Sequence, residues 1–168
     1  MSNVKNLFDD KAIEKLKKIT ESSKTCLFCT DLSVLPINAR PMSVSEIDDN
    51  GDIWFISSKQ SNKNFEIFKD NKVQLFFTNT KDNEFLSLYG EAKIYTDTSI
   101  IEKLWTPIAK AWFNQGKDDP DVSVICVKPN DAYYWDSESG KVISLLKIAA
   151  QAVTGLKMNI GREGKLKF

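Results

Sequence analysis

The chain has 168 residues, a length that suits one domain whose core is large enough to fold without disulfides or bound metal. Hydrophobic residues make up 42% and charged residues 27%, which is typical of globular proteins and argues against a disordered or membrane-embedded chain. Basic and acidic side chains number 23 each, so no surplus of positive charge indicates nucleic acid as a partner.

The first predicted element is a helix from about Asp9 to Glu21. Ile13, Leu16 and Ile19 recur at the three-to-four spacing of one apolar helix face, and an aspartate at the start would cap it. The basic residues between them are expected on a solvated face: Lys15, Lys17 and Lys18.

A C-x-x-C sequence lies in the next predicted element, a short apolar strand over residues 25–31. Cys26 and Cys29 have the spacing of a redox pair or half a metal site, but residues i and i+3 of a strand point to opposite faces. The chain has no histidine, which excludes a Ser-His-Asp hydrolase, a Cys-His nucleophile and a histidine-ligated metal. We therefore interpret these cysteines, and Cys126, as buried structural thiols and expect no metal site. Any redox chemistry must come from a bound cofactor.

Two segments on either side of a turn are central to the prediction. One is the Asn-Ala-Arg-Pro-Met-Ser sequence over 38–43, and the other runs from Trp54 to Lys63. The turn composition of residues 48–52 predicts that they are neighbouring antiparallel strands of one hairpin. Such pairing would bring Arg40 and Lys63 within reach of each other.

The second segment is expected to lead into a short helix. Ser57, Ser58 and Ser61 precede an apolar-periodic stretch over 65–68. A helix N-terminus carries unsatisfied N–H groups and partial positive charge. Together with an arginine, a lysine and three hydroxyls, it predicts a site for a phosphate monoester.

These residues resemble the flavin-binding split barrel of the pyridoxamine-phosphate-oxidase-like superfamily, specifically its general-stress-protein branch. The resemblance extends roughly from the first helix to Trp135. Its residues are, in order, Ala39-Arg40-Pro41-Met42, Trp54-Phe55, Ser57 and Ser61-Asn62-Lys63. It implies a mainly β, α+β fold: a six-stranded antiparallel Greek-key split β-barrel with flanking short helices. We expect one FMN-binding domain over residues 1–168, with a peripheral tail from about 155.

The resemblance also implies a cofactor and its ligands. In the family the arginine and the Ser-x-Lys step hold the phosphate of FMN, so Arg40 and Lys63 become phosphate ligands, with Ser57 and Asn62 as supporting donors. The residues that follow the arginine would face the flavin. The implied cofactor-binding residues are Arg40, Pro41, Met42, Ser43, Ile56, Ser57, Ser61, Asn62, Lys63 and Trp135.

Family members build two flavin sites at a two-fold interface, so the resemblance implies a homodimer. In the superfamily an aromatic residue at about Trp135 reaches the FMN of the other subunit. The alternative is that Trp135 belongs only to a last core strand. One departure concerns the oxidases proper, which carry a second basic residue where this chain has about Ser45. True pyridoxamine-phosphate oxidase activity is therefore not expected.

The rest of the chain reads mainly as strands. Residues 73–77 are apolar and aromatic, and 85–96 alternate around Gly90, which suggests a bulge or a close backbone approach. Short strands with brief helices favour a small antiparallel barrel over a βαβ sheet. A helix from about Asp97 is broken at Pro107. The aromatic residues Trp105, Trp112 and Phe113 form either a hydrophobic plug on the barrel or a wall beside the flavin.

The C-terminal third is predicted in four pieces. A strand over 122–128 precedes a turn at Pro129-Asn130 and a further segment over 132–136. A terminal helix over 141–153 follows, and 161–168 is either disordered or a short edge strand.

The sequence thus predicts an FMN-binding, flavin-dependent oxidoreductase-like protein, stress-related and located in the cytoplasm. The location follows because residues 1–10 are polar and no apolar run spans a bilayer. The alternative is a non-catalytic flavin carrier or sensor, and FAD or a deazaflavin are alternative ligands. We expect no nucleic-acid or membrane partner, and the small-molecule electron donor and acceptor stay open. Catalytic residues are unassigned, with only Tyr89, Tyr133, Tyr134 and Ser43 as candidates.

Overall fold

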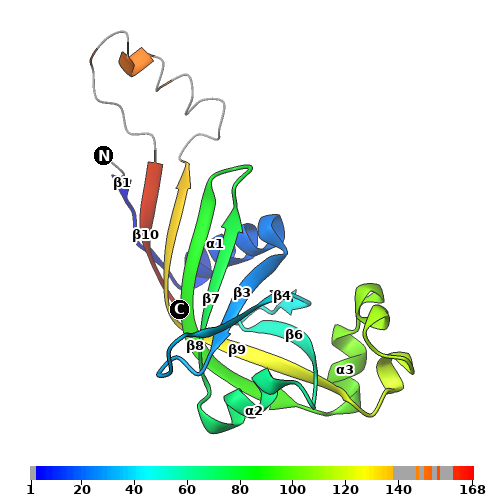
Figure 1. The fold of residues 1–168 in the computed structure, drawn as a ribbon. Coiled ribbons are helices and arrows are strands. Elements are labelled where there is room, and N and C mark those ends of the chain that lie inside the picture. Colours follow the sequence, from blue (N-terminus) through cyan, green and yellow to red (C-terminus); the bar gives the residue numbers. More distant parts are fainter. Residues whose placement is uncertain (1–2, 138–146, 148–149, 153–154, 156–160) are drawn as a thin grey trace.

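The computed structural model describes residues 3–137, 147, 150–152, 155 and 161–168. They form one ten-stranded sheet with a few short helices (Figure 1). The strands are β1 (Asn3–Val4), β2 (Leu7–Phe8), β3 (Thr25–Thr30), β4 (Asn38–Ser43), β5 (Glu46–Ile47), β6 (Ile53–Ser58), β7 (Lys72–Asn79), β8 (Glu84–Tyr95), β9 (Val122–Ser137) and β10 (Gly161–Lys167). The helices are α1 (Asp9–Ser23), α2 (Asn62–Lys69), α3 (Thr98–Leu104) and the 3-10 turns η1 (Pro107–Ala111) and η2 (Gly116–Asp118).

The main path through the sheet is β1-β10-β9-β8-β7-β3-β4, and β9 also pairs with β6. The first half of β9 pairs with β6 and its second half with β10, so the sheet divides along this one long strand (Figure 1). Pairing is antiparallel except where β1 and β2 run parallel to β10. The predicted mainly β split barrel is confirmed, but the described sheet has ten strands rather than six, and it is mixed rather than wholly antiparallel. The predicted turn at Pro129-Asn130 is wrong, because β9 continues through it.

Gly90 marks the bulge that the sequence predicted. The register between β8 and β9 shifts between Tyr89 and Gly90, and Gly90 lies opposite Pro129. A Cβ atom added at Gly90 would lie 2.4 Å from the backbone oxygen of Lys128. Only a residue without a side chain allows the two long strands to approach this closely.

The main core lies between the inward faces of the strands and α1, which packs against β7, β8 and β10. Alternation along β7, where every second side chain is buried, is the expected signature of a sheet with one covered face. The rings of Phe28 and Phe55 meet edge to face, with centroids 5.2 Å apart. A second apolar cluster lies under α3 and contains Ile101, Leu104, Phe113, Val122 and Val124.

The predicted aromatic cluster forms in part. The rings of Trp105 and Phe113 lie 5.9 Å apart against the second apolar cluster, as a hydrophobic plug would require. Trp112 instead leaves 81% of its surface exposed. The helix break at Pro107 is confirmed, since α3 ends before it and η1 begins there.

The predicted hairpin is arranged differently from the expectation. The turn over 48–52 exists, with the Asp48 amide bonded to the Asp52 carbonyl and Gly51 at a φ of 84°. However, β5 rather than β4 pairs with β6, and β4 pairs with β3. The change of partner falls between Val44, whose amide bonds to the Lys24 carbonyl, and Ser45, whose amide bonds to the Trp54 carbonyl. The strand that carries Arg40 therefore lies beside β3.

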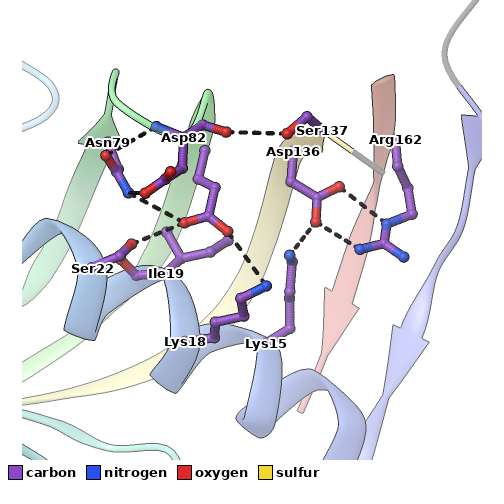
Figure 2. A network of polar contacts seen from close by, with 10 residues as sticks. Lys15, Lys18, Ile19, Ser22, Asn79, Asp82, Asp136, Ser137 and Arg162 are labelled. Atoms are coloured by element: carbon purple, nitrogen blue, oxygen red, sulfur yellow. Dashed lines mark hydrogen bonds and ion pairs between the residues drawn. The ribbon is translucent and has the colours of Figure 1, made fainter. Parts of the chain in front are cut away.

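Helix α1 has the predicted apolar face, and Lys18 is exposed as predicted, but Lys15 does not lie on a solvated face. Lys15 is buried at 7% exposure and bonds to Asp136 on β9 (Figure 2). Arg162 on β10 donates to the same carboxylate through Nε, at 3.0 Å, and Nη2, at 2.7 Å. Burial alone would raise the pKa of Asp136, but the hydrogen bonds from these two cations outweigh it and lower the pKa. The helix start also differs, because Phe8 rather than an aspartate occupies the cap position.

The residues from 161 onward form strand β10 rather than a disordered or edge segment. It lies between β9 on one side and β1 and β2 on the other, and Leu166 is fully buried. A Cβ at Gly164 would lie 2.0 Å from the Lys5 carbonyl oxygen, so the N-terminal strands lie tightly against it. The predicted terminal helix over 141–153 falls largely outside the described residues. In the part that the structure describes, no helix has the length and apolarity to cross a bilayer.

Candidate functional site

Arg40 lies at the centre of a polar cluster between β3, β4 and α2. Direct register pairs Arg40 with Phe28 and Asn38 with Thr30, so the side chains of these residues share the inner face of the sheet. Arg40 donates through Nη1 to Thr30 Oγ1 and through Nη2 to Glu66 Oε2, at 2.9 Å. Asn38 donates to the other oxygen of Glu66, also at 2.9 Å. The cluster holds the guanidinium in one orientation.

Lys63 lies one helical turn before Glu66 and shares the electrostatic surroundings of Arg40. Burial lowers the pKa of Lys63, and the charge of Arg40 lowers it further, whereas Asp121 and Glu66 oppose the shift. Among the described residues Lys63 has no hydrogen bond and no ion pair within 4 Å. The structure thus brings the two predicted cations together, although they lie on β4, paired with β3, and on α2 rather than on the two strands of the expected hairpin.

The predicted hydroxyl donors are used within the protein. Ser57 is buried and donates to Asn64 Oδ1 at 2.8 Å, while Asn64 donates to Ser123 Oγ at 2.9 Å. Ser61 donates to the Ser58 carbonyl at 2.8 Å. These bonds hold the start of α2, and with it Lys63, against β6 and β9. Asn62 is exposed at the first residue of α2.

The three residues after Arg40 do not share one face. Pro41 and Ser43 lie opposite Leu27 and Thr25 on the outer face of the sheet, and the Ser43 and Thr25 hydroxyls are 3.4 Å apart. Met42 points to the other face and packs against the main core. A ligand on one side of β4 can therefore meet only some of these side chains.

The last two predicted cofactor contacts lie apart from the Arg40 cluster within one chain. Ile56 alternates with Ser57 and packs against the second apolar cluster under α3. Trp135 lies in the half of β9 that pairs with β10, with its ring 4.8 Å from that of Tyr133. It pairs with Phe85 and is 41% exposed.

The three cysteines are free and buried, as predicted for structural thiols. Burial raises the pKa of Cys26 and of Cys126 to about 12, so neither is a thiolate at neutral pH. Burial also raises the pKa of Cys29, although the nearby Arg40 opposes that shift. No group of three or more potential metal ligands occurs among the described residues.

Residues 11–159 match the model of a protein family described as pyridoxamine 5′-phosphate oxidase like. The chain belongs to this family. The resemblance that the sequence predicted is confirmed, because the match covers most of the chain.

Relatives of this pyridoxamine 5′-phosphate oxidase-like chain include general stress proteins. Protein bli-3 of Neurospora crassa is 27% identical over 163 residues, covering 91% of this chain and 78% of the relative. The general stress FMN/FAD binding protein of Xanthomonas citri is 29% identical, with a TM-score of 0.67, over 78% of this chain and 92% of that one. A candidate general stress protein 26 of Jannaschia sp. CCS1 has the same fold, with a TM-score of 0.76 at 23% identity, over 92% of this chain and 97% of that one.

The site of this pyridoxamine 5′-phosphate oxidase-like chain contains polar residues that sequence reasoning missed. They are Thr30, Asn38, Glu66 and Asp121. The spacing of Glu66, three residues after Lys63 on a helix, was a usable signal because such residues share a helix face. Thr30 and Asn38 could not be found in this way, since their role depends on the β3–β4 register.

Proposed function

We propose that the chain binds FMN through its phosphate, with Arg40 and Lys63 as the phosphate ligands, and uses the flavin in electron transfer. The observation that supports this most directly is Lys63. It is a partly buried cation beside a second cation, and among the described residues it has no direct anionic partner. Burial and the charge of Arg40 both disfavour the charged form of Lys63. An anionic ligand bound between the two cations would offset their repulsion.

The donors in the cluster fit a phosphate. Arg40 offers five N–H groups, of which Thr30 and Glu66 take one each, so three remain. The ammonium of Lys63 has three more, none of them used within the described residues. Two cations with several free donors match the oxygens of a phosphate monoester. Phosphate donors alone do not separate FMN from FAD or a deazaflavin, which share that end of the molecule.

A bound flavin would supply the electron-transfer chemistry that no side chain of this protein supplies. The protein would hold the phosphate between β4 and α2 and leave the ring to lie beyond β4. Among the described strands β4 pairs only with β3, so its other edge is open. Pro41 supports this placement, because it has no N–H to donate to a further strand along that edge.

We propose that the protein is a homodimer, as family resemblance implies. Cross-strand pairs place an apolar stripe, interrupted by Ser87 and Thr78, on the outer face of the sheet across β3, β7, β8 and β9. Its members are Leu27, Phe76, Phe85, Tyr133 and Trp135, and the first three and the last are between 36% and 51% exposed. Exposed apolar residues gathered on one face are typical of an interface, and Trp135 lies on this face, as its expected contact with the partner's flavin requires. The cytoplasmic location stays a prediction from the sequence.

A non-catalytic flavin carrier or sensor is the second candidate, and the tyrosines favour it. Tyr134 is fully buried and its hydroxyl donates to the Lys5 carbonyl at 2.7 Å, so it cannot serve as a proton donor at the site. Tyr133 lies beside Trp135, away from the Arg40 cluster. Bleaching of bound flavin by NADH or NADPH, with recovery on adding an acceptor, would indicate catalysis; an inert flavin would indicate a carrier or sensor.

The binding proposal is tested by titrating FMN and riboflavin into Arg40→Ala and Lys63→Ala variants. A charge-assisted hydrogen bond contributes about 1.5–3 kcal/mol, so each variant should bind FMN roughly 10- to 100-fold more weakly. Riboflavin, which lacks the phosphate, should bind both variants as it binds the wild type. Lys69→Ala is the matched control, since Lys69 lies exposed at the far end of the same helix. Unchanged FMN affinity in both variants would remove these cations from the site.

A further inference from the structure

The carboxylate of Glu66 already occupies part of the cluster that we assign to the phosphate. It accepts hydrogen bonds from Thr30, Arg40 and Asn38, and its side chain is only 16% exposed. Burial alone would raise the pKa of Glu66, but the bonds from Thr30 and Arg40 outweigh it and lower the pKa. Glu66 is therefore an anion at neutral pH, held where a ligand's phosphate would meet Arg40.

The charges around the cluster nearly cancel before any ligand is bound. Arg40 and Lys63 are the cations that face Glu66, from β4 and from its own helix. Asp121 supplies a second negative charge next to Lys63 and accepts bonds from the Ser58 hydroxyl and the Gln60 amide. The site thus differs from a clamp of two uncompensated cations, which would strongly favour a doubly charged phosphate.

We propose that Glu66 sets the charge selectivity of this phosphate site. Its negative charge weakens the binding of a doubly charged phosphate more than that of a singly charged one, so the two affinities become similar. The inference rests on the proposed flavin-phosphate function. Its ligand class includes the diphosphate of FAD, with one charge on each phosphate, as well as the monoester of FMN, with both charges on one phosphate. Repulsion from Glu66 acts on each phosphate charge, so the dianion of FMN loses about twice as much binding free energy as a monoanion.

Glu66→Gln tests this, because glutamine keeps an acceptor for Arg40 but removes the charge. One unit charge at about 4 Å in a water-like medium changes affinity roughly fivefold. At pH 8 the variant should therefore bind FMN roughly 25-fold more tightly than wild type, with riboflavin unchanged. FAD carries one charge on each of its two phosphates, and only one of these phosphates meets Arg40, so the gain for FAD should lie between roughly fivefold and 25-fold. At pH 5, where the FMN phosphate carries about one charge and Glu66 is still ionised, the gain for FMN should fall to roughly fivefold.

The control is Glu21→Gln, which makes the same change of charge at an exposed position on α1 and should leave all three affinities unchanged. Weaker FMN binding by Glu66→Gln, or the same gain for FMN, FAD and riboflavin, would overturn the proposal. If neither wild type nor variant binds any flavin, the proposed function fails instead. Inorganic phosphate at pH 8, followed by calorimetry, then still tests the charge argument: the variant should bind it more tightly, and equal binding overturns the inference.

Discussion

Asp136 offers the sharpest test of how the fold is held together, because one buried carboxylate serves two cations from different elements. Replacing it with alanine leaves Lys15, 7% exposed, as a buried charge without its carboxylate, and removes the carboxylate to which the Arg162 guanidinium donates (Figure 2). Removing one member of a buried ion pair costs about 3–5 kcal/mol. Arg162 is 24% exposed and can regain water, so we expect about 3 kcal/mol.

For a chain of this length, a loss of about 3 kcal/mol corresponds to a fall in Tm of roughly 6–12 °C. Urea denaturation followed by tryptophan fluorescence measures the free energy of unfolding directly. Asp49→Ala is the matched control, since Asp49 is fully exposed and pairs with Lys17 at 3.0 Å. An exposed pair contributes at most about 1 kcal/mol. Equal losses in the two variants would refute the reasoning.

The pH dependence of the same variant gives an independent check. The pKa of Asp136 is lowered in the folded protein, from 3.8 in its ordinary state. Its contribution to stability is therefore complete above about pH 4 and is lost as the pH falls through the lower, folded value. Wild type should lose stability over that acid range, and Asp136→Ala should lose less.

Two further predictions concern packing and the thiols. Gly90→Ala places a Cβ 2.4 Å from the Lys128 backbone oxygen and should lower the free energy of unfolding by about 1–3 kcal/mol, measured in urea; a neutral result would contradict the close approach. The folded protein should react slowly with a thiol reagent at pH 8, because burial raises the pKa of Cys26 and Cys126 to about 12. Three thiols should react rapidly once the chain is unfolded, and rapid reaction of the native protein would show that they are not buried.

The features predicted correctly depend on residues close together in the chain. The apolar face of α1 follows from a local period, and the bulge follows from one glycine within an alternating strand. The turn over 48–52 was likewise visible in its composition. Family resemblance extended the prediction to the split barrel, which the structure confirms.

The features that were missed depend on partners far apart in the chain. Lys15 looks solvated in a helical pattern because its partner, Asp136, lies 121 residues away. The sequence predicts that the strand with Arg40 pairs with β6, whereas β5 is the strand that does so. The break between β4 and β5 at Val44 and Ser45 has no strong turn signal, so the sequence does not reveal it. Glu66 becomes part of the site only through the β3–β4 register and the placement of α2.

The central claim is that two cations brought together by β4 and α2 bind the phosphate of a flavin. The most direct measurement is a side-by-side titration of FMN and riboflavin into the unmodified protein at pH 8, following the quenching of flavin fluorescence. We predict that FMN binds at least tenfold more tightly than riboflavin. Equal affinity for the two flavins, or no binding of either, would contradict the claim.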